Sequence, residues 1–449
     1  MINSLNHIKM KKFFILSLTL FSIVMNAQNS TEELKYRRSS LSMILVESDK
    51  FPNKDAVMGS WNNYPFPDKY NKHSINLKNV NLESMTLSDK EMLDAGFLKD
   101  TLKTALQLLK ASVKPVRYLN DEQTLAVVLP SENDEYKIKI DKVIKEQKLA
   151  NQLVESWFIK DGKFDLGLIG ERGSYNASQL DASYSKDQAK GSSSLQDAGY
   201  ELVSNSFITF TKLKFIENEP VARAILNLAK AETAKALAGK PEFLINKAMQ
   251  ILDKVYDKTK EGYTLRSNTW LYKLNWDENS LNTVFDIWET PSELAKSDKF
   301  NLDFVNFQSN MSLVTFKLGE TRTQEQIIDL ALVRNVDNAF AKLQKENDVF
   351  KPKIPVLTGK PVTAQIGMKE GLEGGEKFEV LQFGQDPKTG LTVYKKVGTV
   401  QVDKKQVWDN RYNADGKPEK EQMDKQGNPV SATLFSGKAE LGLLLKQVK

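Results

Sequence analysis

The chain has 449 residues, 40% of them hydrophobic and 27% charged, so it is long enough to build two or three separate cores. Its 63 basic residues nearly balance its 58 acidic ones, and this balance gives no reason to expect a nucleic-acid partner. It has no cysteine, which excludes a disulfide framework, a thiolate nucleophile and a cysteine-ligated metal.

The first residues have the layout of a secretory signal peptide. Three lysines, the last of them Lys12, precede an apolar run of 12 residues at 13–24, and Ala27 ends this segment before a polar stretch. The run is too short to span a bilayer, which takes about 20 apolar residues. We therefore expect a signal peptide over residues 1–27 and a mature chain without a transmembrane helix, in the periplasm or associated with the outer membrane of a Gram-negative bacterium. The expected mature chain has a net charge of +2 instead of the +5 of the whole chain, because residues 1–27 contain three lysines and no acidic residue.

Residues 28–200 predict an N-terminal α+β region. Short β-branched or apolar runs favour strands, and recurring apolar positions favour helices. The spacing of Ser88 and Glu91 is that of a capping box at a helix start. The predicted elements are strands at 40–47 and 124–129, and helices at 55–61, from residue 88 to about 112, and at 142–160.

A polar run at 170–176 contains the only candidate binding residues of this region. Glu171, Arg172 and Ser174 could line a cleft, although a turn that caps a following helix is the reading we favour. His73, the only histidine left after removal of the signal peptide, lies in a polar loop. Any serine–histidine–acid triad or histidine-ligated metal would have to use it, and a lone loop histidine is more often structural.

Residues 201–350 predict a central α+β domain. The expected elements are strands at 202–216, 263–276, 282–288 and 312–318, the second and third forming a hairpin across 277–279, and helices from Pro220 to about residue 261, with a break at 239–241, and at 321–346. Around the break, one face carries Ile225, Leu228 and Ala231, and then Leu244, Ala248, Ile251, Leu252 and Val255. The helix at 321–346 is amphipathic and either covers its own sheet or docks on a partner.

Four aromatic residues of this domain allow two interpretations. Trp270, Tyr272, Trp276 and Trp288 could form a platform that stacks on sugars. Aromatic alternation along a strand is more often one face of a core. Exposure of Trp270 and Trp276 would favour the sugar platform.

Residues 351–449 predict a small antiparallel β-barrel of about 95 residues. The sequence pattern changes near the two prolines at 352 and 355. Beyond them, short runs typical of β-strands alternate with glycine-containing turns. The expected strands lie at 362–366, 377–383, 392–402 and 437–445.

Two glycine-containing runs carry a resemblance. The runs are Ile-Gly-Met-Lys-Glu-Gly-Leu at 366–372 and Gly-Glu-Lys-Phe-Glu-Val at 375–380. They are similar to the small C-terminal β domains of exported bacterial envelope proteins. Residues 200–449 as a whole resemble curli-secretion and flagellar-assembly accessory proteins, and the N-terminal half resembles uncharacterised exported proteins of Gram-negative bacteria. The resemblance implies no catalytic or ligand-binding residue.

No catalytic, cofactor or metal motif is present. The chain lacks a phosphate-binding Gly-x-x-x-x-Gly-Lys-Ser/Thr loop and a Gly-x-Ser-x-Gly nucleophile elbow. The turn at 413–416 is not a calcium loop, because Arg411 stands at the first ligand position and Gln422 at the twelfth. We therefore expect a non-enzymatic cell-envelope protein, an adaptor or assembly factor that binds an envelope or outer-membrane protein and needs no cofactor. Two alternatives stay open: a hydrolase that cleaves glycan or peptide with paired carboxylates, and a carbohydrate-binding surface protein. A buried pair of acids in an open cleft would favour the hydrolase.

Overall fold

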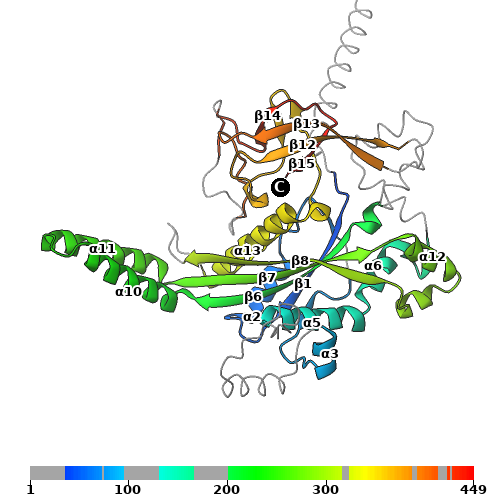
Figure 1. Cartoon of the computed structure of the whole chain (residues 1–449), viewed down its shortest axis with the longest axis horizontal. Coiled ribbons are helices and arrows are strands. Elements are labelled where there is room, and N and C mark those ends of the chain that lie inside the picture. The colour runs from blue at the N-terminus through cyan, green and yellow to red at the C-terminus, as the bar shows by residue number, and fades with distance from the viewer. Residues whose placement is uncertain are drawn as a thin grey trace, which may run out of the picture. The chain divides into compact units, whose positions relative to one another are not determined.

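A computed structural model describes residues 36–72, 75–95, 131–165, 201–315, 323–386, 392–412, 422–424 and 427–448. The chain divides into Met1–Lys35 and Tyr36–Lys449, and every element below belongs to the second unit (Figure 1). It combines helices with two large sheets, so the predicted α+β class is confirmed. In the part of the chain that the structure describes, none of the helices combines the length and hydropathy that crossing a membrane requires.

The first sheet has six strands and is mixed. Its order is β2-β1-β6-β7-β8, with β3 paired to the C-terminal half of β1. β1 runs parallel to β2, β3 and β6, whereas β6, β7 and β8 are antiparallel neighbours. The strands are β1 (Ser40–Glu47), β2 (Asn71–Lys72), β3 (Asn79–Asn81), β6 (Ser206–Glu217), β7 (Gly262–Asn275) and β8 (Asn301–Thr315). Strands from the expected N-terminal and central regions therefore share one sheet.

Helices cover both faces of this sheet because its strands alternate apolar side chains between the faces. On one face, Phe210 and Trp270 pack in a cluster with α5 (Glu132–Glu146) and α6 (Leu149–Phe158). On the other face, Phe207 and Leu271 pack with α2 (Lys54–Asn62) and α13 (Gln324–Glu346). The predictions of a strand at 40–47 and helices at 55–61 and 321–346 are confirmed, and α13 covers its own sheet.

One predicted helix has different bounds in the structure. The helix expected at 142–160 is two helices, α5 and α6, because Lys148 adopts a left-handed conformation with φ of 50° between them. α5 begins ten residues earlier than predicted, behind a capping box of Ser131 and Asp134. A short hairpin of β4 (Ile159–Lys160) and β5 (Lys163–Phe164) follows α6.

The predicted strand at 282–288 is wrong, since this segment lies in and just after helix α12 (Glu278–Asp286). Asp277 caps the helix by accepting a bond from the Ser280 amide, at 2.8 Å, so the expected hairpin turn is a helix start. A 3-10 helix, η2 (Pro291–Lys296), follows. The strand that follows β7 and pairs with it is β8, which begins at Asn301 rather than at residue 312.

A capping box is also present at Ser88, as predicted. The Glu91 carboxylate accepts the Ser88 amide at 2.7 Å, and α3 (Asp89–Asp94) follows. The rest of that predicted helix, the strand at 124–129 and the polar run at 170–176 lie outside the described residues.

The second sheet is an open half-barrel, not the closed barrel predicted. Its antiparallel order is β10-β11-β14-β13-β12-β15-β9, and the two edge strands are two residues long and have one partner each. The strand expected at 437–445 is two strands separated by a turn, with Gly437 at a φ of +128°. The strands are β9 (Ile354–Pro355), β10 (Thr358–Gly359), β11 (Val362–Ala364), β12 (Lys377–Gln385), β13 (Thr392–Val402), β14 (Thr433–Gly437) and β15 (Leu444–Gln447), and the 3-10 turns before and within this region are η3 (Asp348–Phe350) and η4 (Met368–Glu370).

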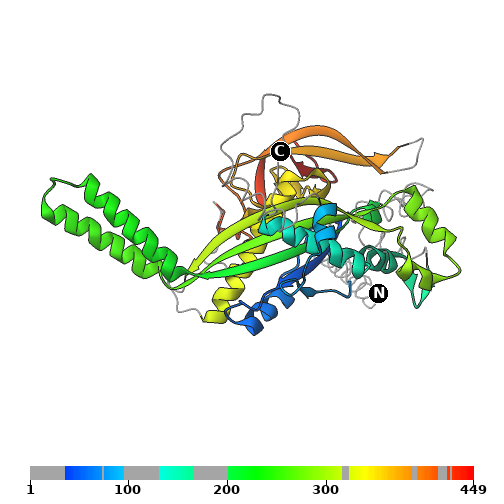
Figure 2. The ribbon, with the colours of Figure 1, turned by 60° about the horizontal axis from the view of Figure 1, so that its bottom comes forward.

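A pair of antiparallel helices is inserted between β6 and β7. They are α10 (Asn218–Ala236) and α11 (Glu242–Thr259), and the predicted break at 239–241 is confirmed. β6 and β7 pair up to Glu217 and Tyr263, so the helices replace the tip of a β-hairpin. Figures 1 and 2 both show them extending beyond the ends of these strands.

Candidate functional site

The cleft residues suggested by the sequence, Glu171, Arg172 and Ser174, lie outside the described residues, as does His73. Their grouping stays a prediction.

The aromatic residues of β7 belong to the core. Trp270 and Tyr272 are 1% exposed and Trp276 is 9% exposed, so none of them presents a ring face to solvent. Trp270 packs against Phe307 with ring centroids 5.1 Å apart. Trp288 is half-buried and stacks on Phe164 at 4.9 Å. The exposure that would favour a sugar platform is absent from these described side chains.

One pair of buried acids, Asp337 and Glu370, meets where α13 contacts η4. Asp337 is 5% exposed, and burial raises its pKa to about 6. It accepts a 2.6 Å bond from the Tyr64 hydroxyl, and the Lys369 ammonium lies 3.8 Å away. Glu370 accepts the Gly367 amide at 2.8 Å. These contacts hold the turn against the helix.

A second polar cluster surrounds Glu201. Its carboxylate accepts the Tyr394 hydroxyl at 2.9 Å and lies 3.2 Å from the Lys353 ammonium. Burial lowers the pKa of Lys353, and Glu201 opposes that shift by stabilising the charged form. The Tyr394 hydroxyl also bonds that of Tyr36 at 2.8 Å. Both oxygens of the acid accept the same hydroxyl, which fits a structural link between β13 and the residues before β6.

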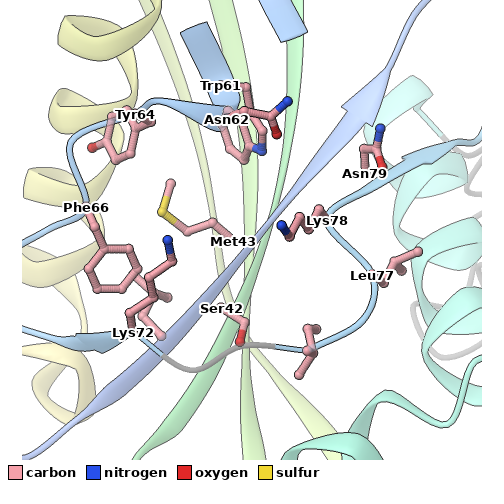
Figure 3. A pocket seen from close by; sticks show the side chains of 12 residues that line it. Ser42, Met43, Trp61, Asn62, Tyr64, Phe66, Lys72, Leu77, Lys78 and Asn79 are labelled. Carbon is pink, nitrogen blue, oxygen red and sulfur yellow. The ribbon is translucent and has the colours of Figure 1, made fainter. Parts of the chain in front are cut away.

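A cavity of about 440 Å³ opens along β1, a size typical of small-ligand pockets (Figure 3). β2 pairs with β1 only up to Leu41 and β3 only from Leu45, so the described ladders leave Met43 without a partner on that edge. Figure 3 shows Phe66 and Lys72 on one side of the strand and Lys78 on the other. The residues that line the cavity include two lysines and no carboxylate. The described lining of the cavity lacks an acid–base pair.

A larger cavity of about 540 Å³ lies beside α5 and β8 and is lined by three aspartates. Asp141 accepts the Tyr272 hydroxyl and the Lys137 ammonium, each at 2.7 Å. Lys148 forms an ion pair with Asp298. Among the described residues, no group of three acidic or histidine side chains is placed to hold a metal ion.

The most unusual surface is that of the inserted helices. In α10 only Asn218 and Ala222 are buried, and in α11 no described side chain is. Large apolar side chains are exposed on both helices: Ile225 by 62%, Leu228 by 66%, Phe243 by 68%, Leu244 by 41%, Ile251 by 55% and Val255 by 53%.

Most of these side chains gather on one face of the helix pair. The contact line between the helices contains Leu226 and Leu252, which are half-buried although each helix has mainly the other as its neighbour. Ile225 and Ile251 immediately precede them and are therefore rotated by about 100° in the same sense. In an antiparallel pair, equal rotation from the contact line places residues on the same face. We call this surface the apolar face; it consists of Val221, Ile225, Leu228, Leu244, Ala248, Ile251 and Val255.

The opposite face of the pair is polar. Asn227 and Asp253 immediately follow the contact-line leucines, and Asn246 occupies the same side of α11. An ion pair of 2.5 Å between Lys230 and Asp253 bridges the helices there. The inserted helices are thus amphipathic as a unit.

The base of the helix pair is fixed to the sheet. The Thr264 hydroxyl on β7 donates to the buried Asn218 side chain at 2.9 Å, and Asn218 donates to the Glu261 carbonyl at 3.5 Å. One turn further, Tyr256 donates to Glu219 at 2.9 Å across the two helices. These hydrogen bonds therefore fix the base of the helix pair that carries the apolar face to the sheet.

The sequence identified the apolar stripes of both helices but not their exposure. A stripe of this kind usually faces a core, and nothing in the chain order indicated that this pair stands outside it. The width of the apolar stripe was the signal that could have indicated this exposure. Leu244-Ile245 and Ile251-Leu252 supply two apolar positions per turn, whereas the contact between two helices needs only one.

Searches for known relatives found neither a matching family model nor a matching curated protein.

Proposed function

We propose that this chain is an exported, non-enzymatic cell-envelope protein, an adaptor or assembly factor that binds another envelope protein through the α10–α11 helix pair. The observation that supports this is the apolar face. Two helices that contribute almost nothing to the core expose a run of isoleucine, leucine and valine, and contiguous exposed apolar surface of this kind marks interaction sites.

Export is supported by the signal-peptide layout of residues 1–27. The buried acids Asp337 and Glu370 are engaged by a tyrosine hydroxyl and a backbone amide and do not line an open cleft, so this pair does not favour the hydrolase. The burial of Trp270 and Trp276 likewise gives the carbohydrate-binding alternative no support.

The test is affinity isolation of the tagged protein from gently solubilised envelopes. Wild type is compared with Ile225→Lys/Ile251→Lys on the apolar face and with Asn227→Lys/Asn246→Lys on the polar face of the same helices. All four residues lie outside the core, so both variants should keep the wild-type circular dichroism and melting temperature.

We expect one envelope protein to co-purify in stoichiometric amount with wild type and with the polar-face variant. The apolar-face variant should not retain it. Retention of the partner by the apolar-face variant would refute the assigned surface. A wild-type protein that is isolated alone but cleaves a glycan or peptide would refute the function.

A further inference from the structure

We infer that the apolar face also seats a second copy of this chain, so that two α10–α11 pairs pack face to face as an antiparallel four-helix bundle. The inference rests on the proposed function, because it takes the same face to be a protein-binding one. It specifies the first occupant of that face.

The width of the apolar pattern points to four helices rather than two. A two-stranded seam needs two apolar positions per heptad, whereas a core-facing helix of a bundle carries a third. In α11, Ile245 and Leu252 lie seven residues apart on the contact line, and Leu244 and Ile251 repeat the same spacing one position earlier. The second row is 41% and 55% exposed at its two members, so none of the described helices of the chain covers it.

The dimensions of the face allow a dimer of modest affinity. Helices of 19 and 18 residues are about 27 Å long and about 10 Å wide each, so the whole side of the helix pair that carries the apolar face measures about 540 Å² per copy. Two copies would bury about 1,100 Å², which just exceeds the roughly 1,000 Å² that a specific interface needs and is below the standard of about 1,600 Å². The dimer should therefore dissociate in a concentration range that can be measured.

A two-fold axis parallel to the helices makes the contact self-complementary. It places α10 of one copy opposite α11 of its partner, so that all neighbouring helices run antiparallel. The interface is then isologous, and each apolar face covers an identical one.

Two charged residues next to the apolar side chains fit this arrangement. Glu232 lies 14 residues after Asn218, and Lys247 lies 14 residues before Glu261, while Asn218 and Glu261 are bonded at the base. Glu232 and Lys247 are therefore level along the helix pair, and Glu232 lies seven residues after Ile225, on the side of α10 that carries the apolar face. Because the two-fold axis sets α10 opposite α11 of the second copy, Glu232 lies level with Lys247 of the second copy, twice per dimer.

Sedimentation analysis of the purified full chain between about 1 and 200 μM tests the inference. We expect wild type and the polar-face control Asn246→Lys to pass from monomer to dimer together. Ile251→Lys should raise the dissociation constant at least tenfold. Glu232→Lys should also weaken the dimer, and adding Lys247→Glu in the same chain should restore it.

A chain that is monomeric over the whole range, or a dimer that Ile251→Lys leaves intact, would overturn the inference. These results are separable from those of the envelope isolation. A monomer whose apolar-face variant still loses an envelope partner, or a monomer that binds lipid vesicles through this face, refutes the second copy as occupant. A dimer that captures no envelope protein supports the second copy and refutes the adaptor function.

Discussion

Replacing Asp337 with asparagine should change how the stability of the protein depends on pH. Asp337 lies in α13 with 5% of its surface exposed, and burial is the main reason why its pKa is raised to about 6. Glu370 raises the pKa further, while Lys369 and the Tyr64 hydroxyl oppose the rise. Asparagine keeps the shape and an acceptor for Tyr64 but never ionises.

The magnitude follows from the gap between the folded and unfolded pKa. The folded value of about 6 exceeds the ordinary 3.8 by about two units. At about 1.4 kcal/mol per unit, this corresponds to about 3 kcal/mol. Because the folded pKa is the higher one, the stabilising contribution is present in full below pH 3.8 and is lost as the pH rises through about 6. Wild type should therefore lose about 2.5 kcal/mol relative to Asp337→Asn between pH 4 and pH 7, because the unfolded chain is already partly ionised at pH 4.

Urea unfolding of both proteins at half-unit steps from pH 4 to pH 8 measures this difference directly. Asp329→Asn is the matched control, because Asp329 is a half-buried acid on the same helix that accepts a hydroxyl bond from Tyr412. A difference between wild type and Asp337→Asn that stays constant within about 0.5 kcal/mol over this range would refute the reasoning, since the ionisation of Asp337 should make it vary.

Three further substitutions test the core. Asn335→Ala should destabilise by about 1–3 kcal/mol in urea unfolding, because its buried amide donates to the Leu265 carbonyl at 2.8 Å and that acceptor would lose its partner. Trp270→Ala should cost at least about 3 kcal/mol by the same assay, as expected of a buried core residue and not of a surface sugar platform. Gly367→Ala should lower the melting temperature, because the added Cβ would lie 2.2 Å from the Trp408 carbonyl oxygen and the backbone would have to move, at about 1–3 kcal/mol.

The parts of the fold that the sequence predicted well are those with strong local signals. The helix break at 239–241 has both glycine and proline, the strand at 40–47 is apolar and bounded by polar residues, and the 321–346 helix has a long apolar period. Each of these depends on residues within one element. They could be read without knowing what packs against them.

The errors arose where a local signal has two meanings. Asp277-Glu278-Asn279 is equally compatible with a hairpin turn and a helix cap, and the decisive contact is the Asp277 bond to the Ser280 amide. The early part of β8 was missed because its alternation is broken near Val305, where the pairing with β7 shifts register. Whether the second sheet closes depends on pairing between strands that are distant in the sequence. The alternation of apolar and polar residues within a single strand carries no information about this pairing.

The sequence predicted which residues form the candidate surface but not that this surface is exposed, for a related reason. Spacing shows which side chains share a helix face, but whether that face is buried depends on where the chain places the helix. Here β6 and β7 pair all the way to Glu217 and Tyr263, so the helices between them begin where the sheet has already ended. Their apolar face is exposed because, among the described residues, no layer of the same chain covers it, and this is why we look to a second chain for its partner.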